Sequence, residues 1–366
     1  MLMRLAGISL AVLLAASCTR SPAPALERFP IGMFGVRQVA EVDALAKEGF
    51  DTFMAEAGTE TVKAMAARAR RHGMRLMAHP GAFREAGAAP SDLPIDAWYA
   101  YDEPDIVGLS SAALAAEIAV VKSWDPRTPV TFVIGQGSPA KKYSGIGDAL
   151  MLDWYPVPHH PVGSVGDEID KAYWYTGGRP LWFLVQSFDW RDWPQRDGKK
   201  PRVGRFPDHI ELRLMSYMAV VHGAKGLFYY TLKRGDGSSL LDWPELWQAT
   251  ARMAREMRAM QPIWSANRRV PLPFQPQPGG IEAACWRWHW RDYLVLVNRH
   301  ADKQLKVPAH LLDRSWRPLF EMRRDPKELL KAANGEHYLP PLRVLVLESR
   351  IQWRELIGLR RAPPSS

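Results

Sequence analysis

Two adjacent carboxylates follow an apolar run in this sequence and could carry chemistry. Asp102 and Glu103 come directly after residues 97–101, AWYAY, and Pro104 and Asp105 follow them. Neighbouring side chains of a strand point to opposite faces, so the two carboxyls would meet different environments. Carboxyls whose environments separate their pKa values can divide acid and base roles. The same residues are also good turn formers, and an acid at this place could instead cap the next helix.

Other acidic residues follow other apolar runs. Asp153 alternates with Met151 and Tyr155, so these three side chains are expected on one face of a strand. Asp153 is therefore a candidate general base, with a hydrogen-bonded residue at the strand end as the alternative. Glu56 and Asp189 also stand at strand ends and are further candidates, Glu56 also as a contact to substrate.

Neutral polar and aromatic side chains accompany these acids. Gln186 and His79 end two of the apolar runs and are candidate contacts to a sugar. The amide of Gln186 both donates and accepts hydrogen bonds, with a satisfied core amide as the alternative. Tyr155 and Tyr229 are candidate substrate contacts, although core positions suit them equally well. Flat aromatic faces can stack on sugar rings, and the chain has 15 tryptophans. Those that follow candidate strands are Trp154, Trp190 and Trp193.

A repeating strand-and-helix pattern would position these residues. Several candidate strands are continuously apolar, as parallel strands covered on both faces are. The eight candidate strands are 30–36, 50–56, 75–80, 97–103, 129–135, 149–155, 180–188 and 226–233. Helical stripes are expected over 38–48, 60–72, 110–123, 208–222 and 244–260, with little helical signal over 81–96. Eight such units predict a TIM barrel; a doubly wound sheet is disfavoured because no glycine-rich loop follows the first strand.

The pattern changes after Pro262, where prolines become frequent and helical stripes end. The candidate strands are 281–290, 293–298, 304–307, 316–322 and 342–348. Short strands with turn signals predict an antiparallel β-sandwich. Trp286, Trp288 and Trp290 alternate along one strand, which favours packing against the barrel over a carbohydrate-binding strip.

The first 18 residues have the form of an export signal. Arg4 precedes an apolar run, and residues 15–18, AASC, resemble a bacterial lipobox whose cysteine, Cys18, becomes lipidated. An ordinary signal peptide is the alternative. The expected product is an exported protein, anchored to the cell envelope on its periplasmic or outer-membrane face. The expected order is a leader at 1–18, a tether at 19–28, a barrel at 29–264, a sandwich at 270–352 and a tail at 353–366.

Charge and cysteine content narrow the set of partners. The formal net charge is +9, but its basic residues are scattered, and nucleic acid is not an expected partner of an exported lipoprotein. An anionic surface polymer or anionic lipid beside the anchor fits better. Cys285 has no expected disulfide partner, His159 and His160 lack a metal-ligand spacing, and no cofactor or metal is expected. The sequence does not indicate an oligomeric state.

The layout resembles clan A-type glycoside hydrolases, in which a TIM barrel precedes a small β-sandwich. Asp102-Glu103-Pro104 is similar to the Asn-Glu-Pro that ends the fourth strand of that clan, where Glu is the general acid/base. The Asp-Glu pair is also similar to hexosaminidase-type barrels, where Asp orients an N-acetyl group. Residues 153–156, DWYP, resemble a sugar-site motif, 226–230 look like an eighth strand, and 293–298 resemble the accessory domain.

One position departs from that clan. Its seventh strand ends in a nucleophilic Glu, whereas here Gln186 stands at that place and cannot serve as nucleophile. The resemblance therefore implies hydrolysis of a glycan with Glu103 as general acid, assisted by Asp102 or Asp153. Two alternatives stay open: an inactive barrel that binds polysaccharide or an envelope partner, and a lyase or transglycosylase on the same fold.

Overall fold

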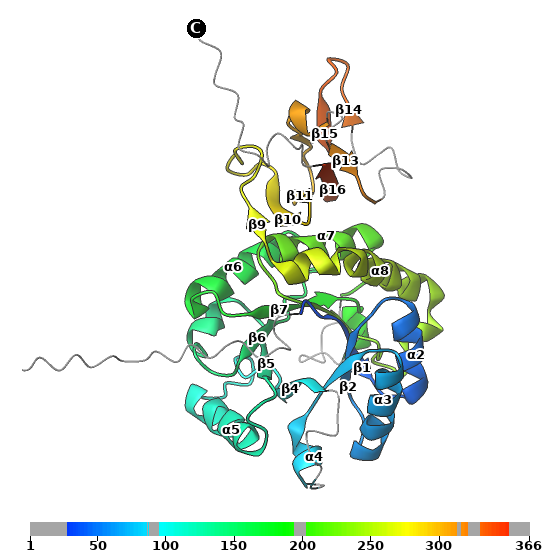
Figure 1. The fold of residues 1–366 in the computed structure, drawn as a ribbon, viewed down its shortest axis with the longest axis vertical. Coiled ribbons are helices and arrows are strands. Elements are labelled where there is room, and N and C mark those ends of the chain that lie inside the picture. The colour runs from blue at the N-terminus through cyan, green and yellow to red at the C-terminus, as the bar shows by residue number, and fades with distance from the viewer. Residues whose placement is uncertain are drawn as a thin grey trace, which may run out of the picture.

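The computed structural model describes residues 28–85, 87, 95–193, 203–312, 316–320 and 330–350. These residues form a closed barrel of eight parallel strands followed by two antiparallel sheets, as predicted (Figure 1). The predicted leader, the Cys18 anchor and the tail lie outside the described residues. Within the described part, no helix combines the length and apolar character needed to cross a membrane.

The barrel strands occur in the order and close to the positions that the sequence predicts. They are β1 Ile31–Val36, β2 Thr52–Ala55, β3 Arg75–Ala78, β4 Ile95–Tyr101, β5 Val130–Ile134, β6 Ala149–Leu152, β7 Leu181–Gln186 and β8 Leu227–Tyr230. Each strand pairs in parallel with the next, and β8 closes the ring by pairing with β1. Side chains of alternating positions fill the interior, and Phe228 leaves no room for a side chain at Gly32.

Helices surround the barrel (Figure 1). They are α2 Val39–Lys47, α3 Thr59–Arg71, α4 Pro80–Glu85, α5 Ser111–Trp124, α6 Ser164–Thr176, α7 His209–Val221 and α8 Pro244–Ala266. The third crossover has only the short α4, in line with its weak helical signal. Helix α6 was not expected, and α8 continues past Pro262, where the sequence pattern suggested a change.

The C-terminal part is a five-stranded antiparallel sheet backed by a three-stranded one. The larger sheet contains β9 Arg269–Val270, β10 Glu282–Trp288, β11 Arg291–Asn298, β13 Trp316–Pro318 and β16 Arg343–Arg350. The smaller contains β12 Leu305–Lys306, β14 Leu330–Lys331 and β15 His337–Leu339. This arrangement confirms the predicted antiparallel domain after the barrel.

Both faces of the five-stranded sheet are covered. Residues such as Trp286 and Val295 join the core shared with the barrel helices, and Cys285 and Leu294 join a second core with the smaller sheet. Trp286 packs edge-on to Trp264 of α8, with ring centroids 4.7 Å apart. Packing against the barrel was the favoured role for this tryptophan, whereas Trp290 lies in a turn after the strand and is exposed.

Charged side chains join the sheet to the barrel. Arg213 of α7 pairs with Glu256 of α8 at 2.9 Å and donates to the backbone carbonyl of Val344 in β16 at 2.6 Å. His222, just after α7, bridges Asp170 and Glu282 of β10. The contacts of Arg213 with Val344 and of His222 with Glu282 both cross from the barrel to the five-stranded sheet, so they hold these two parts together.

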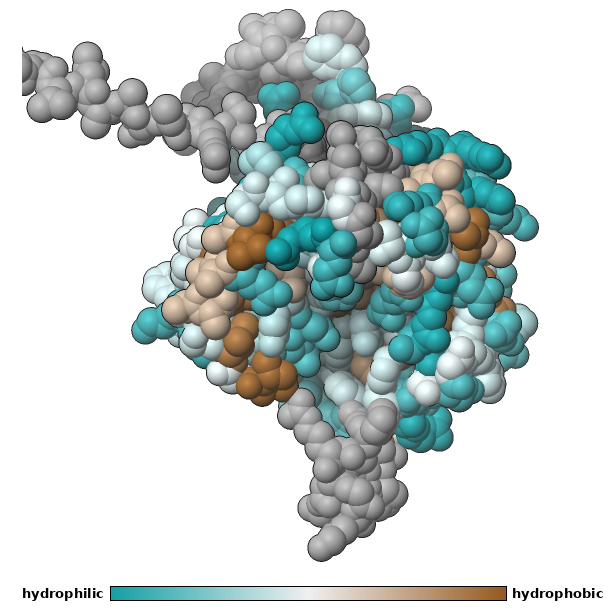
Figure 2. Space-filling model, turned by 90° about the horizontal axis from the view of Figure 1, so that it is seen from below, coloured by the Kyte–Doolittle hydropathy of each residue, from teal (hydrophilic) through white to brown (hydrophobic). Residues whose placement is uncertain are grey.

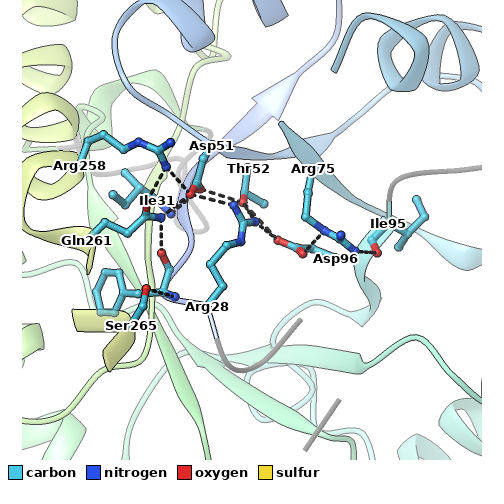
Figure 3. A network of polar contacts seen from close by, with 11 residues as sticks. Arg28, Ile31, Asp51, Thr52, Arg75, Ile95, Asp96, Arg258, Gln261 and Ser265 are labelled. Carbon is cyan, nitrogen blue, oxygen red and sulfur yellow. Dashed lines mark hydrogen bonds and ion pairs between the residues drawn. The ribbon is translucent and has the colours of Figure 1, made fainter. Parts of the chain in front are cut away.

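A polar network closes the amino-terminal end of the barrel (Figure 3). Arg28 pairs with both Asp51 and Asp96, and Arg75 also pairs with Asp96. Arg258 of α8 binds Asp51 at 2.9 Å. These acids sit at the starts of β2 and β4, so this network lies at the end of the barrel opposite to Asp102 and Glu103.

The surface away from the C-terminal sheets is largely hydrophilic, with small separate hydrophobic patches (Figure 2). Single exposed apolar residues are normal on soluble proteins. This face therefore offers no broad apolar surface in the part of the chain that the structure describes.

Candidate active site at the carboxyl ends of the barrel strands

The two carboxylates after β4 lie at the carboxyl end of the barrel, where TIM-barrel sites are built. Asp102 is exposed and accepts a hydrogen bond of 2.5 Å from the Tyr99 hydroxyl. Glu103 is half-buried and has a φ of 44°, in the left-handed region that a residue with a side chain seldom adopts. Strained backbone conformations are frequent at functional sites, so the left-handed conformation of Glu103 supports a functional role for this turn.

The end of β5 lies directly beside Glu103. A side-chain carbon added at Gly135 would lie 3.1 Å from Glu103 Oε1, so the absence of a side chain there makes room for the carboxyl. The Gly135 N–H donates to both carboxyl oxygens of Asp105, at 3.2 and 3.1 Å. Glycine at this position and the short turn through Asp105 therefore fix where Glu103 lies.

Asp153 is the most deeply placed acid of the site. Its exposed fraction is 8%, and its Oδ1 has no hydrogen-bond partner among the described residues. Burial, followed by the charges of Glu103, Asp102 and Asp105, raises the pKa of Asp153 well above its usual range. A raised pKa favours the protonated form of this carboxyl. This suits the general-base role expected from the sequence poorly.

Tyr155 shares the inner face with Met151 and Asp153, as the alternation predicts, and its ring stacks on Tyr230 at 5.5 Å. The Tyr155 hydroxyl is buried without a hydrogen-bond partner in the described structure. Burial, and then the charge of Asp153, raise its pKa. Tyr155 and Tyr230 therefore lie beside the carboxylates of Asp102, Glu103 and Asp153.

An aromatic cluster continues from this stacked pair. Phe188 packs edge-on to Tyr155 at 5.0 Å, Trp190 lies 5.1 Å from Phe188, and Trp193 stacks on Tyr230 at 5.9 Å. Among the aromatic residues named from the sequence, Tyr155, Trp190 and Trp193 therefore meet here. We call Tyr155, Phe188, Trp190, Trp193 and Tyr230 the aromatic cluster.

Tyr229 points away from the site, contrary to the prediction. It is fully buried, and its hydroxyl hydrogen-bonds Ser216 of α7 at 3.1 Å. Side chains alternate along β8, so Phe228 and Tyr230 face the interior while Tyr229 faces the helices. Alternation from an inward Phe228 predicts that Tyr230 faces the site, but Tyr230 was not among the predicted contacts.

Trp154 also faces outward. Its indole N–H donates to Ser164 Oγ at 2.8 Å, and its ring packs on His160 at 4.7 Å. As the neighbour of two inward side chains on β6, it must point to the helix layer. It therefore supports the start of α6 and is not part of the aromatic cluster.

Gln186 is enclosed by backbone groups. Its side chain is fully buried, its Oε1 accepts from the Val157 N–H at 2.9 Å, and its Nε2 donates to the Val157 and Phe188 carbonyls. The amide joins the end of β7 to the loop after β6. This matches the core-amide alternative, so the predicted contact to substrate has no support here.

His79 and Glu56 lie at other parts of the same rim. The His79 ring meets Tyr99 at 4.9 Å, and desolvation lowers its pKa. Burial raises the pKa of Glu56, while Arg37 opposes that shift and Lys233 Nζ lies 3.9 Å from the carboxyl. Neither Arg37 nor Lys233 was singled out from the sequence.

The contacts of Asp189 stabilise a loop. It caps a short helix, Trp190–Asp192, by accepting from the Arg191 N–H at 2.9 Å, and it also pairs with the Arg191 guanidinium. Despite burial, these contacts lower the pKa of Asp189. It therefore holds the loop that carries Trp190. The described residues contain no cluster of His, Cys, Asp and Glu suited to a metal ion.

Comparisons with known proteins show a shared fold. No family model matches the chain, and neither does a curated protein sequence. Among solved structures, an α-amylase from Geobacillus thermoleovorans in complex with acarbose is 10% identical with a TM-score of 0.52, covering 89% of this chain and 98% of that one. An Anoxybacillus α-amylase is also 10% identical, with a TM-score of 0.52 and coverage of 90% and 99%.

A cyclic α-maltosyl-(1→6)-maltose hydrolase from Arthrobacter globiformis gives a similar result. It is 12% identical with a TM-score of 0.50, and the alignment covers 90% of this chain and 100% of that one. Identities this low concern the fold alone. The chain thus shares the overall fold of these solved structures over about nine-tenths of its length.

Proposed function

We propose that this protein hydrolyses a glycosidic bond of a glycan, with Glu103 as the general acid. The observation that carries the proposal is the meeting of Asp102, Glu103 and Asp153 with the aromatic cluster at the carboxyl end of the barrel. Glycoside hydrolysis uses two carboxyl groups, and aromatic faces hold sugar rings. The shared fold with glycoside hydrolases agrees with it but does not assign the residues.

In this reaction a proton moves to the glycosidic oxygen as the bond from that oxygen to the anomeric carbon breaks. The oxygen of a water molecule bonds to the anomeric carbon, and the water gives up a proton to a base. Glu103 is half-buried and can reach substrate, so it supplies the first proton. Asp102 is exposed and fixed by Tyr99, so it either orients the water and accepts its proton or orients an acetamido group.

In this reaction we assign Asp153 a supporting role beside Glu103. Its raised pKa favours the protonated carboxyl, and the charge of Glu103 contributes to that shift after burial. We assign it to holding the resting proton of the site instead of activating water. This replaces the general-base role expected from the sequence.

The test is product release from a panel of α- and β-linked glycans, including N-acetylhexosamine polymers, by the wild type and Glu103→Gln. Glu117→Gln is the matched control, because Glu117 lies exposed in the middle of α5, on the outside of the barrel. Loss of product by about 100-fold or more in Glu103→Gln alone supports the proposal. Equal rates in Glu103→Gln and the wild type would refute it.

A second candidate function is glycan binding without catalysis. Gln186 favours it, because the nucleophilic Glu of clan A is replaced by an amide that is bound to backbone. If no glycan of the panel releases product while sugar binding is equal in the wild type and Glu103→Gln, the binding function replaces hydrolysis.

We also propose that the protein is exported and lipid-anchored through Cys18, which would place the site next to envelope or environmental glycans. The support is the apolar leader ending in residues 15–18, AASC. Intact mass and membrane fractionation of the wild type and Cys18→Ser test it. A wild type that is not lipidated, or that is released from membranes as readily as the variant, would contradict it.

A further inference from the structure

We propose that the amino-terminal end of the barrel binds the surface of an anionic lipid bilayer. The basis is a group of exposed cations that the fold gathers at this end, together with an exposed tryptophan and tyrosine. We call this group the basic face; it consists of Lys47, Arg70, Arg71, Arg127, Trp174, Tyr175 and Arg268. The inference goes beyond the proposed hydrolysis and uses none of the residues of that site.

The topology places the ends of the barrel helices on one side of the molecule. In a (β/α)8 barrel each helix leads into the start of the next strand, so helix ends gather at the amino-terminal end. Here α3 ends at Arg71 and β3 begins at Arg75. The end of α8 meets the start of β1, because Gln261 donates to the Phe29 carbonyl at 2.7 Å. The helices surround the barrel, so their ends outline a broad face (Figure 1).

Five exposed cations of this face take part in no ion pair with the described residues. Arg70 and Arg71 lie in the last turn of α3, and Lys47 lies in the last turn of α2. Arg127 precedes β5, and Arg268 follows α8. Each cation comes from a different connection or helix end, apart from the adjacent arginines. Their scatter along the sequence therefore hides a grouping that the fold creates.

Acids at or near the same end are already satisfied by other groups. The ion pairs are Asp43–Arg68, Glu48–Arg255, Asp51–Arg28, Asp96–Arg75 and Asp148–Lys122. Asp125 is buried and accepts hydrogen bonds from the Trp98 indole and from backbone N–H groups. The five cations are thus left with a positive field that attracts an anionic partner.

Trp174 and Tyr175 add exposed aromatic rings to this face. Both lie in the last turn of α6, and Tyr173 fixes that turn by donating its hydroxyl to the Gly223 carbonyl at 2.5 Å. Trp174 is 83% exposed, the highest value among the large hydrophobic side chains that the structure describes as exposed. Tryptophan and tyrosine are enriched where a membrane meets water, because each combines an apolar ring with a polar group.

The described part of the chain also begins at this end. Arg28 belongs to the polar network that closes it (Figure 3). Ten residues separate Arg28 from Cys18, and a chain spans at most about 3.3–3.6 Å per residue, so a lipid on Cys18 would hold this face within about 35 Å of the bilayer. A lipid chain and a basic patch bind membranes together more firmly than either does alone.

An anionic polysaccharide would also be attracted by these cations. We favour the bilayer because Arg71, Arg127 and Arg268 belong to connections at different points around the barrel (Figure 1), and a plane can contact all of them at once. The choice also rests in part on the proposed anchor. A bilayer at this end leaves Asp102 and Glu103, at the opposite end of the barrel, directed away from the membrane.

The experiment measures co-sedimentation of the full chain carrying Cys18→Ser, which cannot be lipidated, with two kinds of vesicle. One is phosphatidylcholine alone, and the other contains phosphatidylcholine and phosphatidylglycerol in equal amounts. We expect at least about tenfold tighter binding to the anionic vesicles, weakened by added salt. The leader is present in every sample, so differences between samples report on the basic face.

Two variants made in that chain locate the binding. Arg70→Gln with Arg71→Gln should weaken binding to anionic vesicles about tenfold. The control is Lys303→Gln with Lys331→Gln, which removes the same charge from exposed positions of the C-terminal part and should leave binding nearly unchanged. Trp174→Gln should weaken binding several-fold, whereas Trp243→Gln, before α8 at the other end of the barrel, should not.

Equal binding to the two kinds of vesicle overturns the inference, as does full binding by the Arg70 and Arg71 variant. Polygalacturonate that displaces the protein from anionic vesicles, while Trp174→Gln keeps full vesicle binding, would assign this face to an anionic polysaccharide instead. Because the tested chain carries no lipid, a wild type that is not lipidated would contradict the anchor at Cys18 and leave a positive result here standing.

Discussion

Gln186 hydrogen-bonds both the N–H and the carbonyl of Val157, so one side chain fixes the loop between β6 and α6 to the end of β7. Replacing it by Ala removes these bonds and leaves buried backbone groups unsatisfied. We expect Gln186→Ala to lose about 2–4 kcal/mol of unfolding free energy in urea. The control is Gln136→Ala at an exposed position, which should stay within about 0.5 kcal/mol.

Gln186→Glu tests whether this position could regain a nucleophile. The carboxylate cannot donate to the Val157 and Phe188 carbonyls as the amide does, so we expect lower stability and no gain in product release. If Gln186→Glu has unchanged stability and raised activity, this position can hold a catalytic carboxylate, and the expectation is wrong.

Tyr229 and Tyr230 differ only in the face of β8 on which they lie, so they give a matched pair of substitutions. Tyr230→Phe should weaken substrate binding and raise KM several-fold, with little effect on Tm. Tyr229→Phe should lower unfolding free energy by about 1 kcal/mol through the lost bond to Ser216, with unchanged KM. The opposite pattern would contradict the assigned orientation of β8.

Asp153 should make the protein less stable as pH rises. Its pKa is raised in the folded state, so its contribution is fully present below the unfolded pKa of about 3.9 and is lost as pH rises through the folded pKa. Asp153→Asn should therefore raise the unfolding free energy at neutral pH by at least about 1 kcal/mol and lose this advantage in acid. Urea unfolding at several pH values measures it, and a destabilised variant at neutral pH would contradict it.

His222 should weaken the barrel–sheet interface at high pH. Burial alone would lower its pKa, but the hydrogen bonds that its ring donates to Asp170 and Glu282 raise the pKa to about 9. The stabilisation is present below the unfolded pKa of about 6.5 and is lost as pH rises through about 9. Because Asp170 is largely exposed, we expect an effect on the order of 1–2 kcal/mol.

The measurement is the Tm between neutral and alkaline pH for the wild type and His222→Gln. The wild type should lose its advantage over the variant across this range. His310→Gln, on the exposed surface, is the control. A constant difference between wild type and His222→Gln at all pH values would show that the histidine acts only by packing.

Asp96 should contribute to stability and not to activity. It is buried at the start of β4 and pairs with Arg28 and Arg75 (Figure 3). Asp96→Asn weakens the contacts of Arg28 and Arg75 at this end, although Arg28 keeps Asp51 and both guanidinium groups are partly exposed, so we expect a loss of about 1–2 kcal/mol of unfolding free energy. Asp43→Asn breaks a surface pair with Arg68 and should leave the free energy of unfolding nearly unchanged. A changed KM in Asp96→Asn would contradict this separation of the two barrel ends.

The strands were predictable from sequence because parallel barrel strands are buried on both faces and read as apolar runs. The positions of the carboxylates at the strand ends could be predicted as well, because the end of a strand fixes where the next side chain lies. Tyr155 and Asp153 were placed correctly by alternation from Met151. Tyr229 was misplaced because a continuously apolar run hides which face is inward, and only an anchor such as Phe228 resolves it.

The partners of Gln186 lay beyond what the sequence indicates. They belong to a loop 29 residues away, and only tertiary structure brings Val157 to the amide. The same holds for Arg37 and Lys233, which come from opposite ends of the barrel sequence and meet at Glu56. Helix α6 escaped notice because its glycine and aromatic residues obscure the apolar stripe formed by Val165, Ile169 and Ala172.

The five-stranded sheet is buried between the barrel helices and the smaller sheet, and this limits how the gene can be divided. A chain cut at about residue 268 would expose Trp264 and remove the Val344 carbonyl that Arg213 binds. Such a truncated barrel should aggregate, and the isolated sheet should not serve as a portable binding module. Loss or exchange of this part by recombination would therefore require compensating changes on α7 and α8, so the two parts should be inherited together.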